Sequence, residues 1–342
     1  MHLAVKASKR KFFFVVSCIV LFFTIILCSN FGSADIDVYS TVKIILKKIP
    51  LINELIDTNN IDSVKSTIIL KIRLPRILAA TLVGAGLSVV GTSFQGMFKN
   101  PMADPYVLGI SSGAALGATI GIILGVTPTI FAFIGSLAVT IIVYGVAKVG
   151  NKLPTVNLLL AGISISYFIS ALISLLMILN REKIEKVILW TMGSVSSAGW
   201  RQVVILSITV IIGSIIIYVF SKDLNVILVG EETAKSLGIE VEKVKKVLII
   251  VASFMVAVIV SSSGTIGFVG LIIPHMIRLI IGPDNRRVIP FSAIFGGIFL
   301  VLCDTFARTA VEPTELPVGA ITALIGAPLF IYLLYKSKRK II

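Results

Sequence analysis

Ten apolar stretches recur along the chain with only short polar interruptions between most of them. A helix that crosses the hydrocarbon core of a bilayer needs about 20 mainly apolar residues. Hydrophobic residues make up 56% of the 342 residues and charged residues only 14%, against about 25% charged in an ordinary soluble domain. We therefore expect an all-α, polytopic membrane protein with a single domain over 1–342. Its spanning helices are predicted at 12–28, 77–98, 106–124, 129–147, 156–179, 203–220, 247–261, 267–281, 288–307 and 316–335.

The formal net charge of +14 comes from lysines and arginines that form short clusters between the apolar stretches. This distribution argues against a nucleic-acid-binding face. Short cytoplasmic loops accumulate basic residues, and an even number of spans places both chain ends on one side. We therefore expect cytoplasmic N- and C-termini in the plasma membrane. The external segment 31–76 also carries basic residues, but it balances them with acidic ones, and its role is unassigned.

Two polar breaks interrupt the apolar pattern, one in each half of the chain. The first is Gln95–Gly109 and the second is Ser261–Gly270. Irregular backbone at membrane depth must be buried in protein or line a cavity. The breaks lie in corresponding places, which favours an inverted repeat of helices 77–179 and 247–335. We expect the translocation path or the broken-helix elements at Gln95, Asn100, Pro101, Ser262, Gly264, Pro274 and His275, although a plain turn explains the first break equally well.

The sequence shows no site for chemistry. His275 and His2 lie at opposite ends of the chain, and the three cysteines lie in or beside apolar stretches, so we expect no metal site and a structural role for His275. Asp304 and Arg308 have the spacing of an intrahelical ion pair. Four glycines recur every fourth residue at Gly113, Gly117, Gly121 and Gly125, which predicts close helix packing.

The loop 221–246 contains a short predicted helix. Gly230 can serve as its N-cap, and Glu231 and Glu232 complement the positive end of the helix dipole. Gly238 can adopt the left-handed conformation that ends many helices. Such a helix would suit a cytoplasmic partner, although a solvated connector is the plain alternative.

Several ordered strings between about Leu74 and Tyr335 resemble the FecCD permease family of ATP-binding cassette importers for iron siderophores, haem and cobalamin. The strings are RLPRILAATLVGAGLSVVGTSFQGMFKNPMADPYVLGISSGAALGA, WTMGS, GTIGFVGLIIPHMIRLIIGPDNRRVIP and ELPVGAITALIGAPLFIYLL. The resemblance implies a type II importer permease with ten helices. It also implies a second permease copy or a paralogue, two cytoplasmic ATP-binding subunits and an extracytoplasmic substrate-binding protein or lipoprotein.

The resemblance also implies roles for particular residues. Coupling to the ATP-binding subunits would fall on Gly230, Glu231, Glu232, Ala234, Leu237 and Gly238. Arg73, Arg76 and Arg308 match positions where the family presents arginines to acidic residues of the binding protein, so we expect them to lie on the outer side.

No phosphate-binding GxxxxGK[ST] loop occurs in the chain. We therefore expect a non-catalytic subunit without a bound cofactor, with ATP used by the partners. An iron-siderophore complex is the favoured cargo, and haem and cobalamin stay open. An ion-gradient-driven transporter is the alternative, for which only Asp304 and His275 could carry a proton.

Overall fold

The computed structural model describes residues 7–32, 36–47, 62–150, 152–311 and 314–338. Seven helices in these ranges are long and apolar enough to cross a membrane, and three shorter apolar helices bring the number to ten. These ten helices cover all ten predicted stretches, so the all-α prediction is confirmed. They are α1 (Ala7–Cys28), α4 (Leu74–Met97), α5 (Ile110–Leu124), α6 (Pro128–Ala147), α7 (Thr155–Leu179), α9 (Trp200–Val219), α12 (Val241–Ser263), α13 (Val269–Ile281), α14 (Asn285–Thr309) and α15 (Val318–Lys338).

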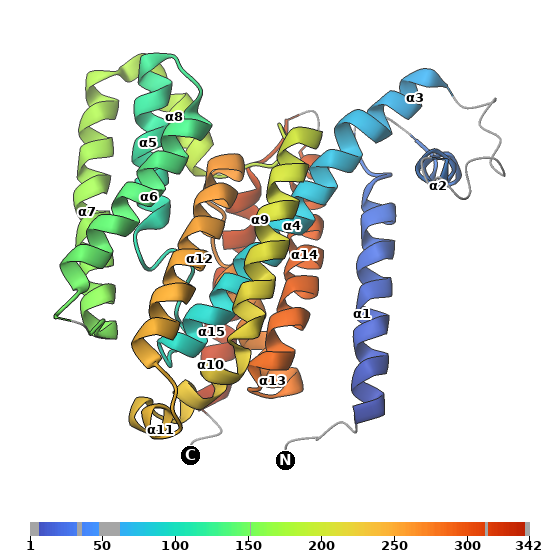
Figure 1. Ribbon diagram of the computed structural model, residues 1–342. Helices are drawn as coiled ribbons and strands as arrows, with labels where there is room; N and C mark the ends of the chain where they lie inside the picture. The colour runs from blue at the N-terminus through green and yellow to red at the C-terminus, as the bar shows by residue number, and fades with distance from the viewer. Residues whose placement is uncertain (1–6, 33–35, 48–61, 151, 312–313, 339–342) are drawn as a thin grey trace.

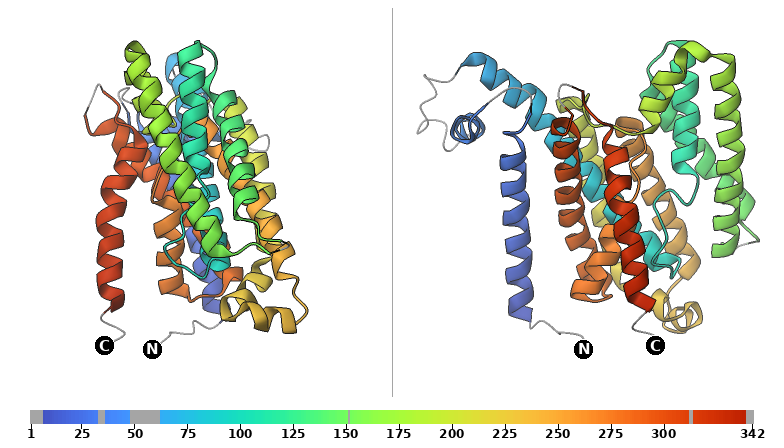
Figure 2. Two further views of the ribbon diagram at one scale, coloured as in Figure 1. Left: turned by 90° about the vertical axis from the view of Figure 1, so that its left-hand side faces the viewer. Right: turned by 180° about the vertical axis from the view of Figure 1, so that it is seen from behind.

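Short helices lie between these ten. On one side of the molecule, uppermost in Figure 1 and called here the α3 side, are α2 (Val38–Leu46), α3 (Ser63–Thr67), the π-helix η2 (Ile68–Arg73), the 3₁₀ turn η3 (Arg181–Lys183) and α8 (Ile184–Thr191). On the opposite side, called the α11 side, are α10 (Ser221–Val229) and α11 (Glu231–Ser236). The first turn of α1 and the last turn of α15 also lie on the α11 side (Figures 1 and 2).

The central helix is α4, which packs against α9, α12, α13 and α14. A Cβ atom added to Gly84 would overlap the carbonyl oxygen of Gly296 on α14, and one added to Gly91 would overlap that of Gly270 on α13. Because lipid tails are as apolar as the side chains, helices in a membrane associate largely through such close backbone packing. The glycines of α4 therefore determine how tightly α13 and α14 can approach it.

A second group of helices, α5 to α7, lies beside this centre and joins it through contacts of α12 with α5 and α6 (Figure 1). Three of the four regularly spaced glycines carry the packing: Gly113 and Gly117 lie against backbone oxygens of α6, and Gly121 lies against Pro128. Gly125 does not take part. It ends α5 in the left-handed conformation, with a φ of 70°.

Helix α1 stands at the edge of the bundle and touches mainly α14 (Figure 2). Near its first turns, the ring of Phe13 stacks on that of Phe291 with 5.2 Å between centroids. The segment that follows contributes to a small separate cluster, in which Ile36, Ile44 and Ile69 are buried together. Helix α2 turns Thr41 and Ile44 inward to this cluster.

Candidate functional site

The two polar breaks meet each other inside the bundle. The Tyr106 hydroxyl donates to the Ile266 carbonyl oxygen at 3.0 Å and accepts from the Ile266 N–H at 3.1 Å. At the end of α4, Gln95 Nε2 donates to the Leu271 carbonyl oxygen at 2.9 Å. Side chains of the first break thus satisfy backbone groups in and directly after the second break, as burial at membrane depth requires.

Three glycines hold the second break against neighbouring loops. Gly193 and Gly264 both have positive φ, 73° and 66°, and a Cβ on Gly264 would overlap the carbonyl oxygen of Trp190. Likewise, a Cβ on Gly319, at the start of α15, would overlap the carbonyl oxygen of Met192. The Ser194 N–H donates to the Ser263 carbonyl oxygen at 2.7 Å. The last turns of α8 and α12 and the first turn of α15 therefore meet so closely that only glycine can occupy the contact positions.

The predicted path residues divide into two groups. Gln95, Gly264 and Pro274 are buried where the breaks meet, and His275 follows half-buried on α13. Its Nε2 has no hydrogen-bond partner among the described residues. Asn100 and Pro101 instead form the turn after α4, where Asn100 Oδ1 accepts from the Met102 N–H, so the plain-turn interpretation describes them. Ser262 donates back to Val258 within α12.

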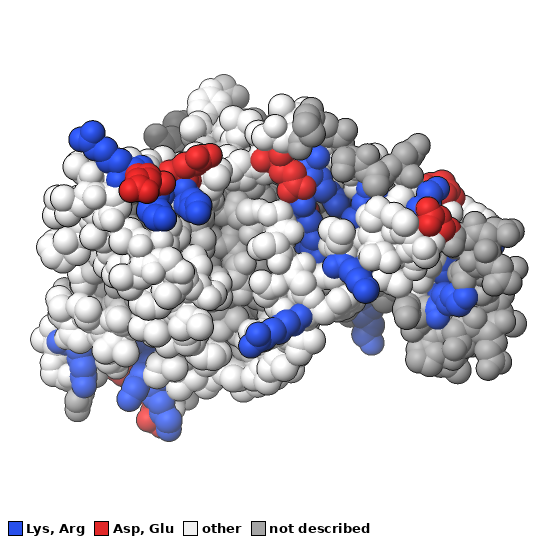
Figure 3. Space-filling model, turned by 90° about the horizontal axis from the view of Figure 1, so that it is seen from above, with Lys and Arg blue, Asp and Glu red and all other residues white. Residues whose placement is uncertain are grey.

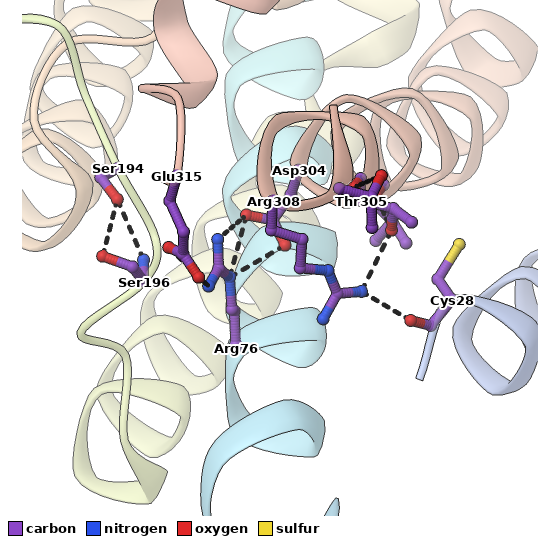
Figure 4. A network of polar contacts seen from close by, with 10 residues as sticks. Cys28, Arg76, Ser194, Ser196, Asp304, Thr305, Arg308 and Glu315 are labelled. Atoms are coloured by element: carbon purple, nitrogen blue, oxygen red, sulfur yellow. Dashed lines mark hydrogen bonds and ion pairs between the residues drawn. The ribbon is translucent and has the colours of Figure 1, made fainter. Parts of the chain in front are cut away.

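A buried charge cluster lies at the α3 end of α4 and α14 (Figure 4). Arg76 Nη2 is 3.0 Å from Asp304 Oδ1, and Arg76 Nε lies 3.1 Å from both oxygens of that carboxylate. Arg76 Nη1 donates to Glu315 Oε1 at 2.8 Å. Asp304 is 1% exposed. The expected ion pair between Asp304 and Arg308 is therefore wrong, because the fork of Arg76 reaches the carboxylate from the neighbouring helix.

Arg308 and Arg73 instead hold the end of α1. Arg308 Nη2 donates to the Cys28 carbonyl oxygen, and Arg73 Nη1 donates to those of Ser29 at 3.1 Å and Asn30 at 2.9 Å. Cations are stabilising at a helix C-terminus, where carbonyl groups lack partners. Arg73, Arg76 and Arg308 are each only 5–6% exposed. All three thus have partners within the subunit, and their docking role stays a prediction.

The π-helix η2 is a feature that sequence reasoning missed. The Leu74 N–H bonds to the Ile69 carbonyl oxygen, one residue further back than in an α-helix. In this register the Leu70 carbonyl oxygen would pair with residue 75, which is a proline and has no N–H. Trp200 Nε1 donates to that oxygen at 2.9 Å. Pro75 was the available signal for this irregular helix. That Trp200 of α9 would bond the Leu70 carbonyl oxygen could not be predicted from the sequence.

On the α11 side, the short predicted helix is confirmed as α11. Gly230 precedes it as N-cap, and Gly238 follows it with a φ of 83°. Ala234 is fully buried, whereas Leu237 is 67% exposed. Glu231 pairs with Lys245 of α12 at 2.9 Å, and Glu232 pairs with Lys235 at the surface. Its hydrogen bond from Lys235 holds the pKa of Glu232 below the ordinary value.

The chain as a whole is similar to known proteins. A family model described as the FecCD transport family matches residues 19–336. A cobalamin import system permease of Halobacterium salinarum is 45% identical, over 77% of this chain and 72% of its own. A hemin transport system permease of Yersinia pestis is 39% identical, over 79% and 84% of the two chains. An Fe(3+)-citrate import system permease of Bacillus subtilis is 35% identical over 97% of each chain.

A solved structure has the same architecture. It is described as an inward-facing conformation of a transporter of the metal-chelate ABC type, with a TM-score of 0.82 and 31% sequence identity. The match covers 95% of this chain and 99% of the other. The helical arrangement seen here is therefore that of an ABC importer permease.

Proposed function

Because the chain belongs to the FecCD transport family, we propose that it is the permease subunit of an ATP-driven importer and that its cargo is a ferric siderophore complex. The observation that carries the proposal is the joined pair of helix breaks within a multi-pass bundle that also presents a short capped helix, α11, on one side. Such broken segments buried in protein are common where transporters move a solute.

The α11 side would be cytoplasmic. Two ATP-binding subunits would contact α11 there, and nucleotide-driven movement would shift the bundle between outward- and inward-facing states. The exposed side chain of Leu237 suits such a contact, and the buried Ala234 anchors the helix to its own subunit. A second permease copy or a paralogue would complete the path.

The α3 side would then face the substrate-binding protein. Figure 3 shows this face, on which charged groups stand apart on a largely uncharged surface. The loops and helix ends here carry exposed cations at Lys71, Arg181, Lys186 and Arg201. Acidic groups of the partner could reach Arg76 only where Glu315 now binds it. Charge complementarity of this kind mainly raises the rate and selectivity of docking.

The cargo is the least constrained part of the proposal. The relatives are named for cobalamin, hemin and Fe(3+)-citrate, and a further relative, of Haemophilus influenzae, is named for molybdate. We favour ferric siderophores within this group because of the breadth of that class in the family. Haem and cobalamin are the alternatives that the experiment must separate.

The experiment is uptake into proteoliposomes that contain the permease with its ATP-binding subunits and binding protein. Labelled ferrichrome, ferric citrate, haem, cobalamin and molybdate are offered one at a time, with ATP or a non-hydrolysable analogue inside. ATP-dependent uptake of ferrichrome, the ferric siderophore of the set, supports the full proposal. Uptake of haem or cobalamin alone corrects the cargo, and uptake that proceeds equally without ATP overturns the mechanism.

A gradient-driven mechanism has little support in the geometry. It would need a proton carrier in the path, for which Asp304 and His275 are the candidates, and Asp304 accepts three hydrogen bonds from Arg76. Asp304→Asn should therefore leave the response of uptake to a proton gradient unchanged.

A further inference from the structure

Asn225 links α10 to the turn between α13 and α14 with both ends of its amide. Its Nδ2 donates to Asp284 Oδ1 at 2.7 Å, and its Oδ1 accepts from the Asn285 N–H at 2.8 Å. Asp284 is the N-cap of α14 and already accepts the Arg286 N–H. Asp284 thus satisfies the Arg286 N–H, and Asn225 supplies the acceptor for the N–H of Asn285, the first residue of α14. Asn225 therefore takes part in capping α14 and at the same time connects it to α10.

The connection continues into the centre of the bundle through Arg278 of α13. Arg278 Nη2 donates to Asn285 Oδ1 at 2.8 Å and to the Thr92 carbonyl oxygen of α4 at 3.2 Å. Its Nη1 donates to the Pro283 carbonyl oxygen at 3.0 Å. An unbroken path of hydrogen bonds thus runs from α10 through the α13–α14 turn to α4, and its members Asn225, Asp284, Asn285 and Arg278 are called here the turn network.

The turn network lies close to α11, the helix that the ATP-binding subunits would contact. Only Gly230 separates α10 from α11, so a displacement of α11 acts directly on α10, as it does on α12 through the pair of Glu231 with Lys245. Burial alone would raise the pKa of Asp284, but hydrogen bonds from Arg286 and Asn225 hold it below the ordinary value. Asp284 is thus charged at neutral pH, and hydrogen bonds to a charged group are stronger than neutral ones.

One atom in the turn network lacks a partner. Asn285 is 0% exposed, and its Nδ2 has no hydrogen-bond partner among the described residues, because its Oδ1 is turned to Arg278. A buried amide donor without a partner is energetically unfavourable. A second arrangement of the turn, in which the Asn285 Nδ2 group donates to an acceptor, would remove that unfavourable contribution. Elements with two alternative arrangements are the kind that transmit conformational change.

We propose that Asn225 is a positioning residue that transmits movement of α11 to the α13–α14 turn and, through Arg278, to α4. This inference rests on the proposed function, since it assigns the route by which ATP-binding subunits acting on α11 would reach the broken helices. The route runs through Asn225 because it is the residue of α10 that bonds both Asp284 and Asn285.

The test is hydrogen–deuterium exchange of the permease assembled with its ATP-binding subunits in nanodiscs, nucleotide-free and trapped with ATP and vanadate. In the wild-type complex, trapping with ATP and vanadate should change the hydrogen-exchange rate both in α11 and at 282–286. In Asn225→Ala the change in α11 should persist, and the change at 282–286 should be lost. Asn225→Asp, which keeps the size but places a carboxylate against Asp284, should give the same loss. The matched control is Lys222→Ala, an exposed position on the same helix.

Each outcome separates the two proposals. If α11 of the wild type does not respond to nucleotide, the proposed function fails. If α11 responds but 282–286 does not, or if Asn225→Ala leaves the response at 282–286 intact, the transmission role alone is overturned. Simple destabilisation would raise exchange equally in both nucleotide states, and that result also counts against transmission.

Discussion

Arg76 on α4 and Asp304 on α14 form a buried ion pair, with 3.0 Å between Nη2 and Oδ1, across a sequence separation of 228 residues. The same guanidinium reaches Glu315 in the segment before α15. One side chain therefore holds the α3 ends of two helices and the approach to a third. The position of this cluster makes it both a structural tie and a candidate docking point.

Removing one partner of this pair should be costly. Arg76→Met leaves the Asp304 carboxylate buried and unpaired, for which we expect a loss of about 3–5 kcal/mol in the free energy of unfolding. Thermal unfolding of the purified permease in detergent would measure it. Arg286→Met is the control: Arg286 is 51% exposed, and its partner Asp284, 19% exposed, keeps a second ion pair with Arg287, so the change should stay within about 1 kcal/mol. Equal losses in the two variants would contradict a stabilising role of the buried Arg76–Asp304 pair.

Glu315 should compete with the binding protein for Arg76. Its side chain is 46% exposed, and it occupies the Nη1 edge of Arg76 that faces away from Asp304. Glu315→Gln should therefore tighten capture of the binding protein by about two- to fivefold at low salt, in keeping with an exposed charge pair. Titration of the labelled binding protein at low and high salt would show it. Glu182→Gln, an exposed change elsewhere on the α3 side, is the control; weaker capture by Glu315→Gln would mean that the partner binds Glu315 itself.

The glycines of α4 should not tolerate a side chain. A Cβ on Gly91 would overlap the carbonyl oxygen of Gly270, so Gly91→Ala must push α13 away from α4. We expect a loss of on the order of 1–3 kcal/mol in stability, as for an overpacked core, and reduced transport. Gly145→Ala on α6 is the matched change, because nothing lies within 4 Å of its added carbon. Similar melting temperatures for the two variants would argue against close packing.

Trp200 should stabilise the π-helix η2. Trp200→Phe keeps an aromatic ring but removes the N–H that satisfies the Leu70 carbonyl oxygen. We expect a loss of about 1 kcal/mol, seen as faster hydrogen exchange in 68–75 and unchanged exchange in α12. Trp190→Phe offers a comparison, since no hydrogen bond from the indole of that tryptophan has been identified in the described residues. Identical hydrogen exchange in 68–75 for both variants would contradict the role of Trp200 in stabilising η2.

The two faces of α11 should respond differently to mutation. Leu237→Glu changes an exposed side chain, so the subunit should fold normally while ATP-driven uptake falls because the partner contact is lost. Ala234→Glu places a charge at a fully buried position and should instead release α11 from its own subunit. Thermal stability together with the ratio of solute transported to ATP hydrolysed separates the two. Normal uptake by Leu237→Glu would refute its coupling role.

Much of the molecule follows from local rules that a sequence displays. Seven of the ten apolar helices are long enough to cross a bilayer, and a helix is what such a stretch forms in lipid, because backbone groups there must bond within their own segment. The spacing of Gly113, Gly117 and Gly121 predicts the close packing seen against α6, and Gly230 and Gly238 mark both ends of α11. These features depend on residues within a few positions of one another, so pattern alone was sufficient.

The candidate sites depend on contacts between residues that are far apart in the chain. Arg308 was the obvious partner for Asp304 by spacing, yet Arg76 has the better approach once α4 lies beside α14. The meeting of Tyr106 with Ile266, and of Asn225 with Asp284, likewise appears only when the helices are placed. The sequence by itself determined a helical membrane protein and where its helices break. Tertiary packing decided which buried charges and polar groups pair, because each takes the partner that the neighbouring helix brings within hydrogen-bond distance.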